Sequence, residues 1–138
     1  MANSECIFCK IANGEISSTT IYEDTMFRVI LDLSPANLGH ALILPKKHYT
    51  DLTELDNAEA EKVLLVAKNI GKAMKKSLNC EGFNIVQNNG EAAGQTVFHF
   101  HTHIIPRYKS DKSMIYWEGK TVTKEELETT GKIIANSL

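Results

Sequence analysis

Cysteine is scarce in this chain, and its count is the first constraint on the class of protein. The 138 residues contain three cysteines, Cys6, Cys9 and Cys80. So small and odd a set excludes the disulfide framework that holds together small secreted domains. We therefore expect reduced thiols, which are available to bind a metal ion.

Long apolar runs and repeated segments are also missing. No stretch approaches the length that spans a bilayer, and the start, M-A-N-S-E-C-I-F-C-K, lacks the basic region and apolar run of a leader peptide. We expect a cytoplasmic protein with no membrane partner. Because repeats, low-complexity stretches and Pro/Ser-rich linkers are absent, residues 1–138 are predicted to form a single domain.

Neither sign of charge is in large excess. The chain has 15 Lys and Arg against 17 Asp and Glu, a formal net charge of -2, and no long block of one sign. This balance argues against a broad nucleic-acid or membrane footprint, although it leaves room for a small phosphate site. Hydrophobic residues make up 43% of the chain, which is enough for an ordinary globular core.

The residues that are present predict short strands on both sides of one long helix. β-Branched and aromatic residues indicate strands, and the first two of these form a hairpin. Apolar residues at steps of three and four predict an amphipathic helix from Asp56 to Leu78. The predicted strands are Thr20–Glu23, Phe27–Asp32, His40–Pro45, Phe83–Gln87 and Val97–Ile105.

The order of these elements predicts the fold class. Asp56 with Glu59 resembles a capping box at the start of the long helix, and Gly82 lies just beyond its expected end. The tail from Lys109 to Leu138 contains T-K-E-E-L-E-T-T-G-K-I-I, a short helix. Strands, one main helix and more strands, without regular alternation, predict an α+β fold with a five-stranded antiparallel sheet and the helix on one face.

Three of the five histidines stand at every second position in F-H-F-H-T-H-I-I-P-R, residues 98–107. In a strand, side chains at every second position share one face, so His99, His101 and His103 are expected to lie together. Phe98, Phe100, Thr102 and Ile104 are then expected on the opposite, core-facing side. Packing a sheet does not require three imidazoles, whereas nucleophiles, proton donors and metal ligands near neutral pH do use them.

The remaining histidines and one glycine-containing loop complete the candidate site. His40 and His48 lie at the start of the third predicted strand and just after P-K-K. Each alone favours a turn or loop residue, but all five histidines in or beside strands suggest one shared site. The loop G-E-A-A-G-Q-T, residues 90–96, is equally compatible with a hairpin turn and with backbone N–H groups that hold a phosphate.

The spacing C-I-F-C at residues 6–9 is that of a zinc knuckle. Thiolate with imidazole is a common ligand mixture for tetrahedral zinc. A redox pair and two ordinary buried thiols are the alternatives, although no thioredoxin-like βαβ pattern surrounds the motif. Cys80 has no partner in a zinc site of this kind and is expected to be a small buried side chain.

H-F-H-T-H-I-I resembles the signature of the histidine triad family, His-φ-His-φ-His-φ-φ, where φ is hydrophobic. The blocks L-D-L-S-P-A-N-L-G-H-A-L-I-L-P-K-K-H and N-N-G-E-A-A-G-Q-T-V, together with C-I-F-C-K-I and Y-E-D, also resemble that family in the same order. They cover most of residues 6–108, and the branch they are most similar to is the small Hint-like nucleotide hydrolases. The tail, residues 109–138, is not covered.

This resemblance implies a homodimer in which two five-stranded sheets join, and a pocket for a purine nucleoside monophosphate unit. It also implies hydrolysis at the α-phosphate, typically of an adenosine 5'-monophosphoramidate, through a covalent nucleotidyl-histidine. A dinucleoside polyphosphate hydrolase and a nucleotide-binding regulator are the alternatives. The related nucleotidyl transferases resemble His-x-His-x-Gln, and histidine at position 103 disfavours that branch.

The resemblance assigns roles to individual residues. His101 corresponds to the nucleophile, His103 to a phosphate contact, and His40 to the histidine that supports the triad. Either a backbone carbonyl or His40 could fix the tautomer of the nucleophile. Asp32 corresponds to the ribose-binding carboxylate. The phosphate loop would contribute Asn88, Gly94, Gln95 and Thr96, the base pocket Phe8, Ile11 and Ile30, and a structural zinc site Cys6, Cys9, His48 and His99.

Overall fold

The computed structural model describes residues 3–112, 115 and 117–138. Its strands form one antiparallel sheet in the order β1-β2-β3-β5-β4, which confirms the predicted α+β class. The strands are β1 Thr20–Glu23, β2 Phe27–Leu31, β3 Ala41–Pro45, β4 Gly82–Val86 and β5 Thr102–Arg107. The helices are α1 Ile7–Ala12, α2 Asn57–Leu78 and α3 Lys124–Ala135, with short 3-10 turns at Leu52–Glu54 and Glu91–Ala93.

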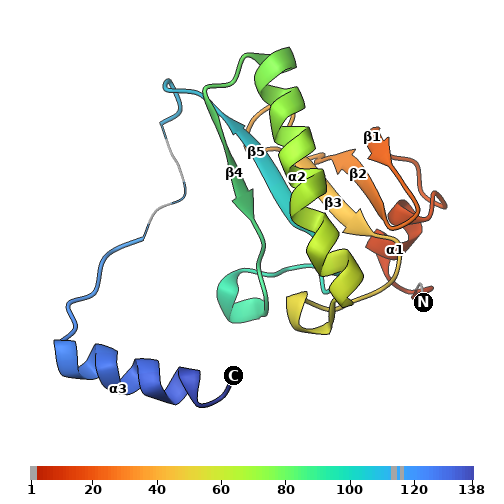
Figure 1. Ribbon diagram of the computed structural model, residues 1–138. Helices are drawn as coiled ribbons and strands as arrows, with labels where there is room; N and C mark the ends of the chain where they lie inside the picture. Colours follow the sequence, from red (N-terminus) through yellow and green to blue (C-terminus); the bar gives the residue numbers. More distant parts are fainter. Residues whose placement is uncertain (1–2, 113–114, 116) are drawn as a thin grey trace.

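The sheet separates two apolar clusters because side chains alternate along each strand. Val29, Ile43 and Ile104 belong to the main core, which α2 covers. Leu42 and Leu44 belong to a smaller cluster on the other face, against α1. Figure 1 shows α2 lying across one face of the sheet and α1 near β2 and β3 on the side away from α2.

Helix α2 matches its prediction in length but not in its caps. Asp56 is the N-cap residue, yet its side chain makes no capping hydrogen bond, so the predicted capping box is wrong. The reason is that its carboxylate accepts hydrogen bonds from the Tyr49 hydroxyl and from Lys47. At the other end Asn79, with φ 53°, terminates the helix, and Gly82 begins β4 instead.

Strand β5 begins later than expected. The prediction placed it at Val97–Ile105, whereas the pairing of β5 with β3 and β4 begins at Thr102. Phe98 is 50% exposed, so its predicted place on the core face is wrong, while Phe100, Thr102 and Ile104 are buried as expected. Residues 97–101, called the catalytic segment below, therefore lie beyond the end of the sheet ladder.

The two shorter helices differ in how far the sequence predicted them. Helix α1, which carries Cys9, was not predicted, because its six residues are too few to show a period. Helix α3 confirms the short helix expected in the tail, and a capping box of Thr123 and Glu126 begins it. None of the helices in the described parts of the chain has the length and hydropathy needed to cross a bilayer.

We predict that Gly71→Ala destabilises the fold by about 1–3 kcal/mol, because a methyl group there would overlap the ring of Phe83 between α2 and β4. Gly119→Ala is the control, since nothing lies within 4 Å of a methyl group at that position. It should be neutral or slightly stabilising. Chemical denaturation of both variants measures the difference, and an equal effect of the two would contradict the packing assigned to Gly71.

Candidate functional site

The catalytic segment is held by backbone carbonyls of residues 45–50. The Phe100 N–H donates to the carbonyl of Tyr49 at 2.7 Å. The Gln95 side-chain amide donates to the carbonyl of Thr50 at 2.7 Å, and a ring nitrogen of His99 lies 3.0 Å from the carbonyl of Pro45. These contacts replace the missing strand pairing and fix the histidines in place.

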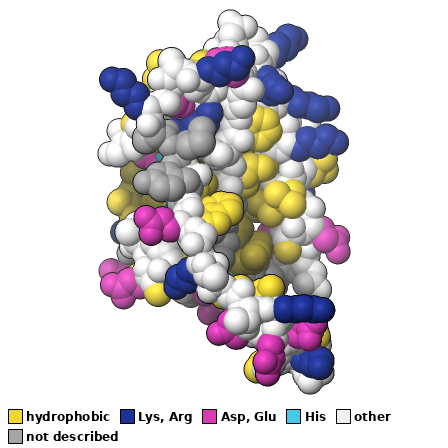
Figure 2. Space-filling model, turned by 90° about the vertical axis from the view of Figure 1, so that its left-hand side faces the viewer, with side chains coloured by type: hydrophobic (Ala, Val, Ile, Leu, Met, Phe, Trp, Pro, Cys, Tyr) yellow, Lys and Arg dark blue, Asp and Glu magenta, His cyan; other side chains and the backbone are white. Residues whose placement is uncertain are grey.

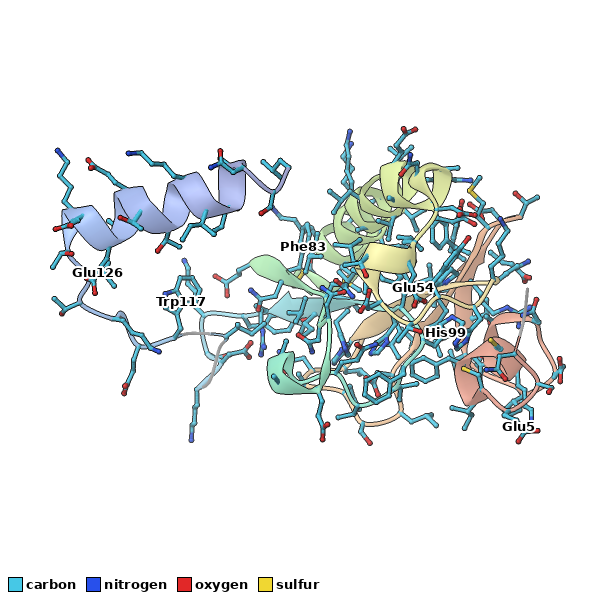
Figure 3. All side chains as sticks on the ribbon, turned by 90° about the horizontal axis from the view of Figure 1, so that it is seen from below. Glu5, Glu54, Phe83, His99, Trp117 and Glu126 are labelled. Atoms are coloured by element: carbon cyan, nitrogen blue, oxygen red, sulfur yellow. The ribbon has the colours of Figure 1, made fainter. Side chains whose placement is uncertain are left out.

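Four side chains that the sequence assigned to a metal meet in one cluster. Cys6, Cys9, His48 and His99 each offer one ligand atom, and these atoms lie within 4.8 Å of one another. The Cys9 sulfur lies 3.3 Å from Nδ1 of His48 and 3.4 Å from Nδ1 of His99. The Cys6 sulfur lies 3.5 Å from the same nitrogen of His99. Figure 3 shows His99 in the interior, between α1 and the turn that carries Glu54.

The geometry of this cluster fits a tetrahedral metal ion. With Zn–S near 2.3 Å and Zn–N near 2.0 Å, sulfur and nitrogen ligands on one zinc stand roughly 3.5 Å apart. His99 donates its Nε2–H to the Pro45 carbonyl, which leaves the Nδ1 lone pair facing the sulfurs. Burial lowers the pKa of His99 to about 4 and therefore keeps the ring neutral, as a ligand must be. Burial raises the pKa of the Cys9 thiol, and a bound cation would offset that cost.

His101 is held in one tautomer by a backbone hydrogen bond. Its Nδ1 lies 2.7 Å from the carbonyl oxygen of His99, so Nδ1 carries the proton and donates it. In the neutral ring Nε2 is then unprotonated, and the ring lines an open pocket. Burial lowers the pKa of His101, which favours the neutral form. Of the two possible partners that the sequence left open, the structure selects the backbone carbonyl.

A hydrogen bond joins His40 to His103, and the neighbouring backbone shows which ring donates it. The Ala36 N–H donates to Nδ1 of His40 at 3.0 Å, so the proton of a neutral His40 resides on Nε2. That Nε2 lies 2.9 Å from Nδ1 of His103 and donates to it. Nδ1 of His103 is therefore an acceptor, and the Nε2–H of His103 is a donor to whatever occupies the site. The Asp32 carboxylate lies 3.7 Å from Nε2 of His40.

The pocket beside these histidines has a volume of about 290 Å³. His101 and His103 lie on its wall, and Asp32 and Thr96 add further polar groups. Phe8 also packs edge-on against the ring of His101, with centroids 5.1 Å apart. The apolar wall combines α1, the ends of β2 and β3 and the catalytic segment, through Ile7, Phe8, Ile11, Ile30, Leu31, Leu33, Leu42 and Val97.

Three residues of the expected phosphate loop do not reach the pocket wall. Asn88, Gly94 and Gln95 are not among the residues that line it. The Gln95 side chain is buried and braces the loop, because its oxygen accepts from the Gly90 N–H and its nitrogen donates to the carbonyls of Thr50 and Val97. Gly94 adopts φ 89°, a conformation that favours glycine.

A second group, Asp32 with His40 and His103, also brings three possible ligand atoms within 4.8 Å. The 2.9 Å separation of the two imidazole nitrogens matches a hydrogen bond. Two nitrogens on one tetrahedral zinc would stand roughly 3.3 Å apart, since each Zn–N bond is near 2.0 Å. We therefore interpret His40 and His103 in this group as the hydrogen-bonded pair described above.

The structure also uses backbone groups that sequence patterns did not indicate. The carbonyls of Pro45 and His99 set two tautomers, and the Ala36 N–H sets a third. Main-chain donors and acceptors are present at every residue, so no residue type marks those that act here. Pocket residues such as Leu42 and Val97 were missed for a similar reason, because ordinary apolar side chains carry no chemical signal.

Comparison with known proteins connects this geometry to one family. The HIT domain matches residues 13–110. An uncharacterized HIT-like protein of Methanocaldococcus jannaschii is 45% identical over 123 residues, which cover 88% of this chain and 95% of that protein. An adenosine 5'-monophosphoramidase of Schizosaccharomyces pombe is 34% identical over 134 residues, which cover 96% and 98% of the two chains.

Solved structures agree with the sequence comparison. A HIT family protein from Bacillus anthracis superposes with a TM-score of 0.90 at 42% identity and covers 100% of this chain and 99% of its own. A Zn-bound histidine triad family protein from Mycobacterium smegmatis superposes with a TM-score of 0.76 at 35% identity, over 96% and 97% of the two chains.

We predict that His103 stays neutral, with its proton on Nε2, as the pH falls from about 7 to about 5. Burial first, and then the neighbouring His101 and His40, lower its pKa to about 4. ¹⁵N NMR of the imidazole nitrogens measures both the tautomer and the titration. In denaturant the same ring should titrate near its ordinary pKa of about 6.5.

The lowered pKa of His103 also predicts that the folded protein loses stability in acid. Between the two pKa values the unfolded chain binds the proton and the folded chain does not, so the free energy of unfolding decreases as the pH falls from about 6.5 towards about 4. Because His103→Asn removes this group, that variant should lose less stability over the same range. A folded-state His103 that titrates near 6.5 would contradict the assigned geometry.

Proposed function

The chain belongs to the HIT family, and from that premise we propose that it is a hydrolase of purine nucleoside phosphoramidates. The reaction proposed is attack at the α-phosphate, with a covalent nucleotidyl-histidine as the intermediate. The observation that carries this proposal is His101, whose protonated Nδ1 is held by the His99 carbonyl while the ring lines the pocket. Such an imidazole is a pre-oriented, neutral nucleophile.

The proposed reaction proceeds in two displacements. In the first, the lone pair on Nε2 of His101 forms a bond to phosphorus, and the bond from phosphorus to the amine nitrogen breaks. The amine leaves with that electron pair and takes up a proton from solvent. In the second, a water oxygen attacks phosphorus, its proton passes to solvent, and the bond to Nε2 breaks. The products are the amine, the nucleoside monophosphate and free His101.

The hydrogen bond from His40 prepares His103 to stabilise the negative charge that develops on the phosphate oxygens. Since His103 accepts from His40, its own Nε2–H can donate to a phosphate oxygen throughout the reaction. The low pKa of His103 means that this donor is a neutral imidazole. A neutral ring stays in one tautomer, so the donor does not depend on proton uptake near neutral pH.

The rest of the pocket fits a nucleoside. We propose that the Asp32 carboxylate accepts hydrogen bonds from the ribose hydroxyls, and that Phe8, Ile11 and Ile30 contact the base. All four line the same pocket as His101. The Ser34 N–H donates to one oxygen of Asp32 at 2.8 Å and fixes the carboxylate at the pocket edge. For Asn88, Gly94 and Gln95 we propose an indirect role, in which they shape the loop that presents Thr96.

We also propose that Cys6, Cys9, His48 and His99 bind a structural zinc ion. Four protein ligands complete a tetrahedral shell and leave no position for substrate. Bound zinc would tie α1, which forms one wall of the pocket, to the catalytic segment. Within this proposal His99 stabilises the site, whereas His101 and His103 contact the substrate.

A homodimer joined at β4 is the assembly we propose. Among the described residues β4 pairs only with β5, so it is an edge of the sheet. Ile85 on this strand is 43% exposed. Edge strands expose unpaired backbone groups, and the same strand of a second copy can satisfy them.

We predict that His101→Ala lowers turnover of a fluorogenic adenosine phosphoramidate by at least about 10³-fold, because the covalent route is lost. His103→Asn, which removes the donor to the phosphate and keeps the nucleophile, should lose about 10²-fold. Nucleotide binding, measured by calorimetry, should survive in both variants. With a slow leaving group, mass spectrometry should locate the nucleotide on the peptide that contains His101.

Two outcomes would sink this assignment. Undiminished turnover by His101→Ala would exclude it as the nucleophile. Nucleotide binding by the wild-type chain without turnover of any phosphoramidate would favour a binding or regulatory role. Hydrolysis of a dinucleoside polyphosphate in preference to phosphoramidates would keep His101 as the nucleophile but change the substrate class.

Elemental analysis should find one zinc per chain. Cys9→Ala and His48→Ala should abolish that content, because each removes one of four ligands. Cys80→Ala is the matched control. Cys80 is buried in the main core, away from the cluster, so this variant should keep its zinc. Two zinc ions per chain would instead indicate a metal at Asp32, His40 and His103, and zinc retained by Cys9→Ala would exclude the proposed ligand set.

A further inference from the structure

The C-terminal arm, which the structure describes at residues 109–112, 115 and 117–138, bonds to the body at Lys109 and Asp111 and ends in helix α3, whose residues are all exposed. Figure 1 shows the arm running beyond β4, with α3 separated from the sheet and from α2. No residue of α3 is buried. Leu127 is 61% exposed and Ile134 is 59% exposed. Figure 3 shows Trp117 and Glu126 on this arm, far from the labelled residues of the body.

Helix α3 has one apolar stripe. Leu127, Gly131 and Ile134 recur at steps of four and three, so they share a face. Glu125, Thr129 and Lys132 occupy the opposite face. An isolated helix of this length is marginal in water, so packing of its apolar stripe is the expected source of its stability.

The arm keeps its place in a related crystal structure. A TM-score cannot exceed the fraction of residues that superpose. Residues 1–108 are 108 of the 138 residues, so superposing them alone would give a TM-score of at most about 0.8. The Bacillus anthracis protein reaches 0.90 over the whole chain. Part of the arm therefore superposes too, although it does not pack on its own body. Contact with another molecule accounts for a shared position of this kind.

An apolar groove on the body has the character to accept such a helix. It lies between the second half of α2 and strands β1 and β2 and has a volume of about 280 Å³. The arm of the same chain lies beyond β4, at the opposite edge of the sheet from β1. A helix that fills the groove must then come from another copy. The groove is lined by Ile21, Leu31, Gly39, Ile70, Ala73, Met74, Ser77 and Leu78.

Charge favours the same pairing. Lys72 and Lys76 are exposed on α2, next in sequence to the groove residues Ala73 and Ser77. Within the described residues no carboxylate pairs with either lysine. On helix α3, Glu126 and Glu128 lie on either side of the apolar stripe, whereas Glu125 faces away from it. Figure 2 views the molecule from the β4 side, opposite the groove, and shows Lys and Arg side chains along one margin beside exposed hydrophobic ones.

We propose that α3 of each chain docks in the α2 groove of a second copy, so that the two arms clasp the dimer. The apolar stripe fills the groove, and glutamates of α3 approach Lys72 and Lys76 of the other copy. The arm leaves the body on the side of the β4 edge, where the proposed dimer places that copy. This inference rests on the proposed homodimer and is independent of the catalytic role of His101.

Photo-cross-linking of the full chain tests this arrangement. A benzophenone amino acid replaces Thr130, beside the apolar stripe, and the matched control replaces Thr129 on the opposite face. Each protein is mixed with ¹⁵N-labelled wild type, illuminated and digested. We expect cross-links from position 130 that join labelled and unlabelled chains and map to residues 70–78 of α2. Position 129 should give a much lower yield.

Charge reversal provides a second readout. Lys72→Glu with Lys76→Glu should lower the yield from position 130, and adding Glu128→Lys to the arm should restore part of it, whereas Glu125→Lys on the opposite face should not. Cross-links within one chain, cross-links that map elsewhere on the second copy, or a monomer in sedimentation analysis would each overturn the proposal. Turnover of the phosphoramidate is not used as a readout, so failure here is distinguishable from failure of the proposed function.

Discussion

The docking of the catalytic segment on residues 45–50 is the constraint on which the site depends. Residues 97–101 have left the sheet ladder, and three carbonyls, those of Pro45, Tyr49 and Thr50, hold that segment and the adjoining Gln95 in place. Tyr49 is itself anchored, because its hydroxyl donates to Asp56 at the start of α2. The position of His101, the proposed nucleophile, is thus linked to the main helix of the fold through one short loop.

The same docking divides the three histidines between different tasks. His99 donates its Nε2–H to the Pro45 carbonyl, so its Nδ1 faces the sulfurs of Cys6 and Cys9. His101 donates its Nδ1–H to a carbonyl, which leaves its Nε2 unprotonated and available as the proposed nucleophile. His103 accepts from His40 and becomes a donor at the pocket. In each ring one hydrogen bond decides what the other nitrogen can do, and burial keeps all three rings neutral.

Much of the fold was predictable because the spacing of apolar and β-branched residues along the chain indicates most of its helices and strands. The steps of three and four from Val63 to Leu78 marked α2, and β-branched residues marked four strands with small errors at their ends. The errors occurred where a distant partner overrides local preference. Asp56 lost its capping role to Tyr49 and Lys47. The alternating pattern continued back to Val97, but pairing with β3 and β4 began only at Thr102.

The sequence by itself determined which chemical groups the site contains. The histidine spacing, the two N-terminal cysteines and their resemblance to one family supplied the candidate nucleophile and the metal ligands before any coordinates. Tertiary structure decided how those groups act. Pro45 is 54 positions from His99, and His40 is 63 from His103. Only folding brings such groups within hydrogen-bond reach, and the tautomer of each imidazole depends on that contact, which no local pattern encodes.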